Sequence, residues 1–568
     1  MKLKSNILFM LLMLAANNDH ALAQNLVQNP GFESGVAPWV AWGGATLTQT
    51  GTEPHGGSFA VAASNRSASW QGPVQSLLGV LEPGRSYRVS AWVRVAGSTE
   101  EPVGMTMARE DDRGLQYLGL NQSTAYSDRW VQIIEIYQHT QDGVLTRLDF
   151  YFQGPAPGVD LLVDEVEIEA FPMDWQAAAN QRIDDLRKRD IAVTVRGQDG
   201  QPVAGATVTL EQTKRSFPIG TTIRYSAFAN EVNYRDYILQ RFNWGVHENA
   251  AKWYSNERNR DQVSYANADE VLDWADAHGI EMRGHTIFWA PETWQPNWVP
   301  ALNDADLALE VEDRLEDVVA HFQGRFRHWD VNNEMLHGSF FADRLGPDIR
   351  DWMFQRTRAL DPDVKLFVND FSVVAGNETD GYVSQIQDFL DRGIPVDAIG
   401  VQGHFSDVSP LSVQLRLDML AELGLPIWIT ELDVVQADEF DRADALEAFM
   451  RMAFSHPSVE GIVLWGFWAG SHWKGPDAAL VDEDWTINAA GQRFDTLLAE
   501  WTSHESLTTE ASGIAQARVF HGDYRVIVAT PGGAVIELNA SVAPGQEPIT
   551  VMADLGVLFG DSFEAASQ

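Results

Sequence analysis

Carboxylates, amides and aromatic side chains follow several of the apolar stretches in this sequence. The stretch WDVNNEM places Glu334 directly behind Asn333, and the stretch ITELDVV contains both Glu431 and Asp433. A fully buried strand is normally a continuous apolar run, so these polar groups indicate strand ends. Further polar or aromatic residues end the neighbouring stretches, namely Glu248, Asn249, Lys252, His285, Trp289, Asn369, Asp370, Gln402, His404, Trp465 and Trp473.

These residue types suit the binding and cleavage of a sugar chain. Indole faces stack on the apolar C–H faces of sugar rings, and amides and lysine bond to hydroxyl groups. Two carboxylates across such a cleft, one ionised and one protonated, are the groups that glycoside hydrolysis requires. The sequence has no Cys–His zinc cluster, no EF-hand loop and no G-x-S-x-G motif. We therefore predict neither a metal nor another cofactor.

Each of these residues also has an ordinary structural explanation. A single glutamate at a strand end is usually a solvated rim residue, and a lone histidine is more often a core residue than a catalyst. However, polar or aromatic groups recur at the same end of seven consecutive strand-like stretches. This recurrence favours one shared mouth over seven unrelated residues.

Eight apolar stretches alternate with helical patterns in residues 217–504. The stretches are FPIGTTI, FNWGVHENAAKW, IEMRGHTIFW, FRHWDVNNEM, KLFVNDFSVV, AIGVQGHF, PIWITELDVV and GIVLWGFW. Between them lie amphipathic segments such as LALEVEDRLEDVVAHFQG, with apolar residues at helical spacing. This alternation predicts an α/β fold, a (β/α)8 TIM barrel. A doubly wound open sheet is the alternative, but no Gly-rich phosphate loop follows the first strand.

The flanking regions predict further parts. Residues 1–23 have a basic start, a short apolar run and an Ala-Leu-Ala cleavage site, which is typical of a secretory signal peptide. Residues 24–172 alternate strand-like runs with turn residues and predict an all-β jelly-roll sandwich. Residues 173–216 predict a connector helix and a small β element. Residues 505–568 predict a small C-terminal β region, either a β module or a set of accessory strands, with a tail.

Composition limits the possible partners. The chain has 568 residues, with 80 acidic and 40 basic side chains and a formal net charge of −40. Such a surface repels nucleic acid and anionic lipid, so we expect neither as a partner. The signal peptide predicts a secreted, extracellular protein, and the absence of cysteine means that packing alone must stabilise it. We expect a monomer.

The stretches HENAAKW, RGHTIFW, WDVNNEM, LFVNDF, VQGHF, WITELDV and LWGFWAGSHW occur in order and at barrel spacing. As a set they resemble the xylanases of glycoside hydrolase family 10. The resemblance implies a retaining endo-1,4-β-xylanase with xylan and xylo-oligosaccharides as partners. It implies that Glu334 is the acid/base and Glu431 the nucleophile. Two residues depart from the common pattern: Ala290 replaces a histidine, and Phe371 replaces a tyrosine.

The resemblance also implies roles for the remaining mouth residues. Asn333 would bond to the sugar 2-hydroxyl, and His404 backed by Asp433 would keep Glu431 ionised. Gln402 would lie near the acid/base. The substrate-binding residues would be Glu248, Asn249, Lys252, His285 and Trp289, with Trp465 and Trp473 as walls of the site.

The N-terminal region has a resemblance of its own. Its stretches NLVQNPGFESG, ASNRSASWQGP and VDEVEIEAF resemble carbohydrate-binding module family 22. The resemblance implies that Trp70 is a stacking platform for xylan, with Arg66, Tyr117 and Glu165 as polar partners. The alternative for Trp70 is a core position between the two sheets.

Three alternatives to the xylanase remain at this stage. The first is a non-catalytic carbohydrate-binding protein with a decayed barrel. The second is an enzyme acting on β-1,4-glucan, and the third is a transglycosylase that uses the same covalent intermediate.

Overall fold

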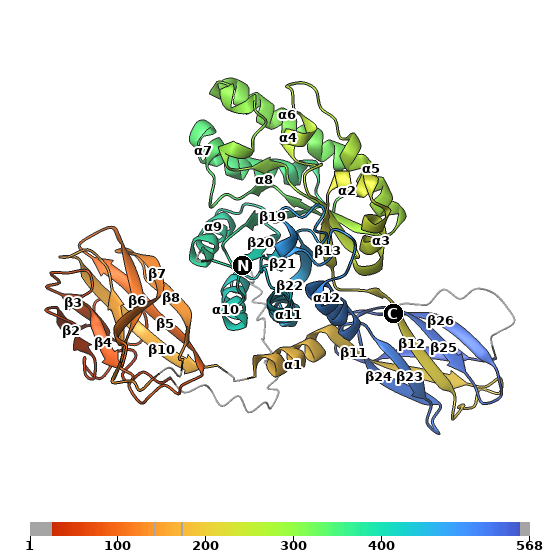
Figure 1. Cartoon of the computed structure of the whole chain (residues 1–568), viewed down its shortest axis with the longest axis horizontal. Helices are drawn as coiled ribbons and strands as arrows, with labels where there is room; N and C mark the ends of the chain where they lie inside the picture. The colour runs from red at the N-terminus through yellow and green to blue at the C-terminus, as the bar shows by residue number, and fades with distance from the viewer. Residues whose placement is uncertain (1–24, 141–142, 172–173, 377, 557–568) are drawn as a thin grey trace, which may run out of the picture. The chain divides into compact units, whose positions relative to one another are not determined.

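The computed structural model describes residues 25–140, 143–171, 174–376 and 378–556 (Figure 1). The chain divides into two compact units, Met1–Met173 and Asp174–Gln568. The predicted signal peptide and the end of the predicted tail lie outside the described residues. Among the described residues, no helix is long and apolar enough to span a membrane.

The first unit is a sandwich of two five-stranded sheets, in the orders β1-β4-β9-β6-β7 and β2-β3-β10-β5-β8. Alternate residues of each strand face inward. In β5, for example, Tyr87, Val89 and Val93 are buried in the core between the sheets. The predicted all-β sandwich is confirmed. The strands are β1 Val40–Ala41, β2 Thr46–Thr50, β3 Ala60–Ser64, β4 Pro73–Ser76, β5 Ser86–Ala96, β6 Glu100–Asp111, β7 Gly114–Tyr126, β8 Val131–Gln138, β9 Arg147–Gln153 and β10 Asp160–Ala170.

Eight parallel strands of the second unit close into a barrel, in the order β13-β14-β15-β17-β19-β20-β21-β22. Every residue of β21 is buried, because one face points into the barrel and the other packs against helices. The eight predicted strands and the TIM barrel are confirmed, and the open-sheet alternative is wrong. The strands are β13 Ile219–Ile223, β14 Trp244–His247, β15 Glu281–Gly284, β17 His328–Asp330, β19 Lys365–Asp370, β20 Ala398–Phe405, β21 Ile427–Val434 and β22 Val459–Leu464.

The helices form a ring outside the barrel strands (Figure 1). Helix α6 begins where the Asn303 side chain accepts the Asp306 N–H, and its apolar face, including Leu307, Val311 and Leu315, is buried. The helices are α2 Tyr225–Asn230, α3 Val232–Arg241, α4 Trp253–Asn256, α5 Ala266–Ala277, α6 Asp304–Phe322, α7 Phe340–Leu345, α8 Asp348–Leu360, α9 Thr379–Asp391, α10 Pro410–Ala421, α11 Glu439–Ser455 and α12 Ala489–Glu500. A short two-stranded sheet, β16 Phe288–Trp289 with β18 Asn332–Asn333, lies beyond the strand ends.

The predicted connector and C-terminal regions are not separate parts. Strands β11 Lys188–Arg196 and β12 Thr207–Arg215 join β23 His504–Thr508, β24 Ile514–Phe520, β25 Gly522–Ala529, β26 Val535–Val542 and β27 Ile549–Asp554. The two sheets, β24-β11-β27 and β23-β12-β25-β26, enclose one core. Residues 188–215 and 504–554 therefore form a second sandwich, interrupted in sequence by the barrel. The connector helix α1 Trp175–Arg187 contacts the barrel helix α11.

The shared core of this second sandwich can be tested by its effect on the free energy of unfolding. Val526 of β25 is fully buried, whereas Val535 of β26 is 63% exposed. We expect Val526→Asp to lower the free energy of unfolding by several kcal/mol, since it buries a carboxylate without a partner. Val535→Asp should change it by less than about 0.5 kcal/mol. Thermal unfolding of both variants checks this, and equal melting temperatures would contradict the shared core.

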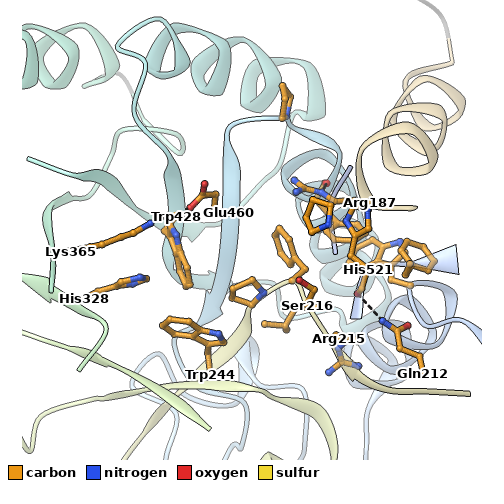
Figure 2. A pocket seen from close by; sticks show the side chains of 18 residues that line it. Arg187, Gln212, Arg215, Ser216, Trp244, His328, Lys365, Trp428, Glu460 and His521 are labelled. Carbon is orange, nitrogen blue, oxygen red and sulfur yellow. Dashed lines mark hydrogen bonds and ion pairs between the residues drawn. The ribbon is translucent and has the colours of Figure 1, made fainter. Parts of the chain in front are cut away.

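A cavity of about 420 Å³ lies beneath the barrel, at the starts of its strands (Figure 2). Trp244, His328 and Trp428 line it from the barrel, and Gln212 and His521 line it from the second sandwich. Its walls are tied together by Arg187, whose guanidinium donates to the carbonyls of Phe454, His456 and Val459. Active sites of such barrels lie at the opposite, C-terminal face, so this cavity is separate from the predicted site.

Candidate active site

The predicted polar residues gather at the C-terminal ends of the barrel strands. Glu431 and Asp433 lie in β21, Gln402 and His404 lie in β20, and Glu334 directly follows β18. The other predicted residues lie in or after neighbouring strands: Glu248, Asn249 and Lys252 follow β14, His285 follows β15, Trp289 is in β16, and Trp465 and Trp473 follow β22.

Glu334 is a nearly buried carboxyl group, 8% exposed. Its backbone is left-handed, with φ of 62°, and its N–H donates to the Asn369 carbonyl. The side chain accepts hydrogen bonds from Trp289 Nε1 at 2.7 Å and Gln402 Nε2 at 3.1 Å. Burial raises the pKa of Glu334, and the nearby charge of Glu431 raises it further against the effect of these two donors. Glu334 is therefore suited to carry a proton.

Glu431 is buried among donors. Its Oε1 accepts a hydrogen bond from Asn369 Nδ2 at 3.0 Å, and its Oε2 lies 3.4 Å from His404 Nε2. Both groups stabilise a negative charge on the carboxylate. Glu431 is therefore suited to act in its ionised form.

His404 is held between two carboxylates. Its Nδ1 lies 3.0 Å from Asp433 Oδ2, which also accepts a hydrogen bond from Trp473 Nε1 at 2.7 Å. Burial alone would lower the pKa of His404, but the adjacent carboxylates of Asp433 and Glu431 raise it to about 9. The imidazole is consequently charged near neutral pH and faces Glu431 as a cation.

Two asparagines connect the glutamates. Asn369 Nδ2 donates to Asn333 Oδ1 at 2.8 Å as well as to Glu431, and Asn333 Nδ2 lies 3.2 Å from Glu334 Oε1. Thr430 Oγ1 donates to Asn369 Oδ1 and fixes the orientation of that amide. The sequence places Asn369 at a strand end of the mouth, but we had predicted no role for it. Its position at the polar end of the stretch LFVND is the signal that marks it.

One side of the mouth is lined by Lys252 and two indole rings. The ammonium group lies 4.3 Å from the centre of the Trp289 ring and 5.8 Å from that of Trp465. Burial lowers the pKa of Lys252. Asn249 Oδ1 accepts hydrogen bonds from Lys252 and Tyr254. These residues form a wall of donors and aromatic faces that fits a sugar ring.

Two further residues support this wall and were not predicted. Arg224 holds Glu248 with two hydrogen bonds, from Nε at 2.7 Å and Nη2 at 2.5 Å. Asp330 is fully buried and accepts from His285 Nδ1 at 2.8 Å and Arg283 Nη2 at 2.7 Å. Asp330 is the aspartate of the WDVNNEM stretch, so its acidic character was visible, but its partners were not.

The two departures from the common pattern lie close to Glu334. The Ala290 N–H donates to the Asn333 carbonyl at 2.8 Å, so the residue continues the short β16–β18 pairing. Phe371 stacks on His337 with ring centres 3.6 Å apart and an angle of 17° between the planes.

The barrel sequence matches a known protein family. The family model described as glycosyl hydrolase family 10 matches residues 209–494, which include the whole barrel. The chain belongs to glycosyl hydrolase family 10. The prediction of a glycoside hydrolase barrel is thereby confirmed.

The relatives of this family 10 chain differ in their names. It is 45% identical over 359 residues to "Anti-sigma-I factor RsgI6" of Acetivibrio thermocellus, covering 63% of this chain and 47% of the relative. It is 38% identical over 484 residues to "Endo-1,4-beta-xylanase 1" of Arabidopsis thaliana, a match that covers 84% of this chain and 50% of the relative. It is 35% identical over 573 residues to "Endo-1,4-beta-xylanase 3" of the same plant. That match covers 94% of this chain and 75% of the relative. The chain thus spans about half the length of two of these relatives.

The sandwich that precedes the family 10 domain carries an aromatic face. Trp42, next to β1, lies 4.5 Å from Tyr151 of β9 and 6.3 Å from Tyr117 of β7, measured between ring centres. The Arg147 guanidinium covers the Trp42 ring at 4.5 Å. A family model described as a carbohydrate binding domain matches residues 24–158. The prediction had named Tyr117 but not Trp42 or Tyr151.

The other residues predicted to contact sugar in this module differ in their exposure and in their partners. Trp70 is 45% exposed, so the core alternative for it is wrong. Arg66 is buried, and all three of its guanidinium nitrogens donate to backbone carbonyls, including those of Gln71 and Val159. This structural role replaces the predicted sugar contact. Glu165 belongs to the other sheet and pairs with His55 at 2.5 Å, away from the aromatic face.

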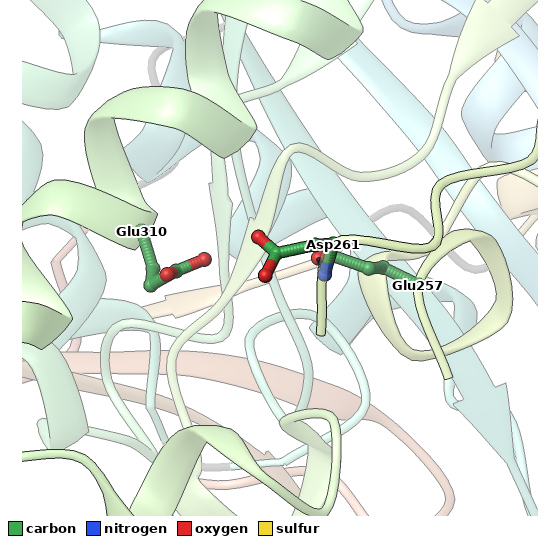
Figure 3. Close-up of side chains that lie close together, drawn as sticks. All are labelled: Glu257, Asp261 and Glu310. Atoms are coloured by element: carbon green, nitrogen blue, oxygen red, sulfur yellow. Dashed lines mark hydrogen bonds between the residues drawn. The ribbon is translucent and has the colours of Figure 1, made fainter. Parts of the chain in front are cut away.

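Glu257, Asp261 and Glu310 form an acidic cluster on the barrel, with one oxygen from each within 4.8 Å of the others (Figure 3). Two of its three carboxylates already have hydrogen-bond partners. Arg260 Nε donates to Glu310 Oε1 at 2.7 Å, while Glu257 accepts from Trp253 Nε1 and from the Asp261 N–H. These contacts account for the cluster as part of the loop structure, and we assign no metal to it.

Proposed function

We propose that this protein is a retaining endo-1,4-β-xylanase that cleaves internal bonds of xylan through a covalent glycosyl-enzyme. The observation that carries the proposal is the pair of glutamates at one mouth in opposite environments. Glu334 is buried with a raised pKa, while Glu431 faces the charged His404. Two relatives named endo-1,4-beta-xylanases support xylan as the substrate.

In the first step, Glu431 attacks the anomeric carbon while Glu334 protonates the departing oxygen. The His404 imidazolium faces Oε2 of the attacking carboxylate, and Asn369 holds its Oε1 in place. Asn333, ordered by Asn369, presents its amide toward the sugar 2-hydroxyl. We expect the two carboxyl groups to be about 5–5.5 Å apart, the separation typical of retention.

In the second step, Glu334 acts as a base. Once Glu431 carries the sugar, its negative charge is gone, and the pKa of Glu334 falls. Glu334 then removes a proton from water, which attacks the same face that the leaving group left. The product keeps the β configuration. A sugar hydroxyl in place of water would give transglycosylation by the same route.

We also propose that the N-terminal module, of the family 22 type, binds xylan on the aromatic face of Trp42 and Tyr117, which the buried Tyr151 supports from below, with Trp70 as a further platform. Trp42→Ala should weaken binding to soluble xylan about tenfold, since a stacked indole is lost. Trp130→Ala, which removes a partly exposed indole just before β8 of the other sheet, is the matched control. Affinity electrophoresis measures both, and equal binding by the two variants would contradict this face.

The predicted setting of the enzyme completes the proposal. The basic start, apolar run and Ala-Leu-Ala site of residues 1–23 support export to the extracellular space. The charge of −40 supports a protein that binds neither nucleic acid nor membranes. We expect a monomer. N-terminal sequencing of secreted protein should begin at Gln24, and sedimentation should give a mass near that of one chain.

A second candidate is a carbohydrate-binding protein without turnover. It is favoured by the similarity to a relative named as an anti-sigma factor, a name that denotes regulation and not hydrolysis. Reducing-sugar release from glucuronoxylan separates the two candidates. Turnover supports the xylanase, and binding without turnover supports the second candidate. Carboxymethylcellulose in the same assay tests the β-1,4-glucan alternative.

A further inference from the structure

The segment that follows Glu334 is anchored from two neighbouring elements. Asp370, the last residue of β19, accepts the Leu336 N–H on Oδ2 at 2.8 Å. Its other oxygen, Oδ1, lies 2.6 Å from His337 Nδ1. Asp370 therefore holds both a backbone group and a side chain within three residues of the proposed acid/base.

Helix α8 provides the second anchor. Arg350 donates from Nη2 to the Met335 carbonyl at 3.2 Å and to the Gly338 carbonyl at 3.0 Å. The segment 334–338 is thus held on both sides of His337. This arrangement accounts for the ability of Glu334 to keep a left-handed backbone, which a non-glycine residue adopts only when its surroundings impose it.

His337 is the only member of this arrangement that combines partial exposure with a titratable ring. Its side chain is 26% exposed, against 1% for Asp370, and Phe371 covers one face of the imidazole. The hydrogen bond to Asp370 raises the pKa of His337. Burial raises the pKa of Asp370, and the hydrogen bond from His337 opposes that rise. When His337 is protonated and Asp370 is ionised, the two side chains form an imidazolium–carboxylate pair beside Glu334.

We propose that His337 and Asp370 form a positioning pair that orients the Glu334 segment and sets the electrostatic environment of its carboxyl group. The inference rests on the proposed role of Glu334 as acid/base. Neither residue has to touch the substrate for this role. Phe371, which departs from the common pattern, supplies the flat apolar surface on which the His337 ring lies.

The charges around the pair determine the direction of its effect. Asp370 adds to the rise in the pKa of Glu334, and the His337 imidazolium opposes Asp370. The other titratable or charged groups that face these residues are Glu378 at His337, Arg350 and Tyr382 at Asp370, and Glu431 and Lys252 at Glu334. Removing one charge of the pair should therefore move the titration of Glu334, and the two removals should act in opposite directions.

The variants His337→Asn and Asp370→Asn test this. The asparagine at 337 retains a hydrogen-bond donor near the Nδ1 position but carries no charge. We expect Glu334 to titrate about half a pH unit higher in His337→Asn, because Asp370 is no longer neutralised, and lower in Asp370→Asn. The double variant should return close to the wild type.

Two readouts are required. One is the basic limb of the pH profile of kcat/KM on an aryl β-xylobioside, which falls as Glu334 loses its proton. The other is the ¹³C titration of the Glu334 side-chain carboxyl, assigned by its loss in Glu334→Gln. The second does not depend on turnover, so an inactive wild type would refute the proposed function while the pair is still measured.

Opposite shifts that cancel in the double variant support the positioning pair. Wild-type titration in both single variants, or shifts of the same sign, would overturn it. If Asp370→Asn fails to fold, His337→Asn decides alone: an upward shift supports the pair, and an unchanged titration means that His337 only packs against Phe371.

Discussion

Glu431→Gly should lose at least about 10⁴-fold of the activity on xylan, the scale seen when a covalent nucleophile is removed. The loss should occur in kcat, because Glu431 acts on the anomeric carbon and the indole and amide wall of the site remains. Asn369 and His404 would keep their positions around the vacated space. Initial rates on glucuronoxylan measure the effect, with thermal unfolding as a check that the fold is retained.

Azide makes this prediction specific. A small anion can occupy the space that the glycine leaves and attack the sugar from the same side as Glu431. On an aryl β-xylobioside the product should be an α-xylobiosyl azide. Glu422→Gly, which removes an exposed carboxylate from the end of helix α10, should retain full activity and form no azide adduct. Full activity in Glu431→Gly would refute its role.

Glu334→Ala should show a different defect. Activity on xylan should fall by about 10²- to 10⁴-fold, the contribution typical of general acid catalysis. The first step should survive on a substrate with a good leaving group, such as a dinitrophenyl xylobioside, because that group departs without a proton. The glycosyl-enzyme would then accumulate, giving a burst of phenol followed by slow turnover.

The configuration of the azide product again decides the role. In Glu334→Ala, azide should attack the accumulated glycosyl-enzyme and give a β-xylobiosyl azide, the opposite anomer from that of Glu431→Gly. Stopped-flow absorbance and proton NMR of the product measure these effects. An α-azide from Glu334→Ala would mean that the two roles are exchanged.

The barrel and most of its mouth could be predicted because each strand and its polar end lie within one short stretch of sequence. A stretch such as PIWITELDVV is apolar until Glu431 and Asp433, and this pattern locates both the strand and its end. Because parallel strands place their C-terminal ends at one face, the polar ends had to converge. Convergence needs no knowledge of which side chains pair.

The pairings themselves could not be predicted. Asn369 joins Asn333 to Glu431 across strands, and Arg224 reaches Glu248 from another loop. Such contacts depend on side-chain directions and on the short β16–β18 sheet, which no periodicity reveals. His337 is a similar case, since its sequence neighbours give no indication of the Asp370 carboxylate beneath it.

The second sandwich, which the barrel interrupts in sequence, could not be predicted for a related reason. Strands β11 and β12 find their partners about 300 residues away, with Leu210 opposite Glu505 and Val526. Alternation of apolar residues identified the strands on both sides of the barrel. This alternation does not show which strands pair, so the two β regions were predicted without the link between them. Arg66 likewise looked available for a ligand because burial cannot be read from a single polar residue.

Retention through a covalent intermediate is tested by the anomeric configuration of the first product. Proton NMR should follow hydrolysis of an aryl β-xylobioside by the wild-type protein from the first minutes. We predict that β-xylobiose appears first and that the α anomer grows only by slow mutarotation. Initial appearance of the α anomer would show single displacement and would contradict the roles of Glu334 and Glu431 derived above.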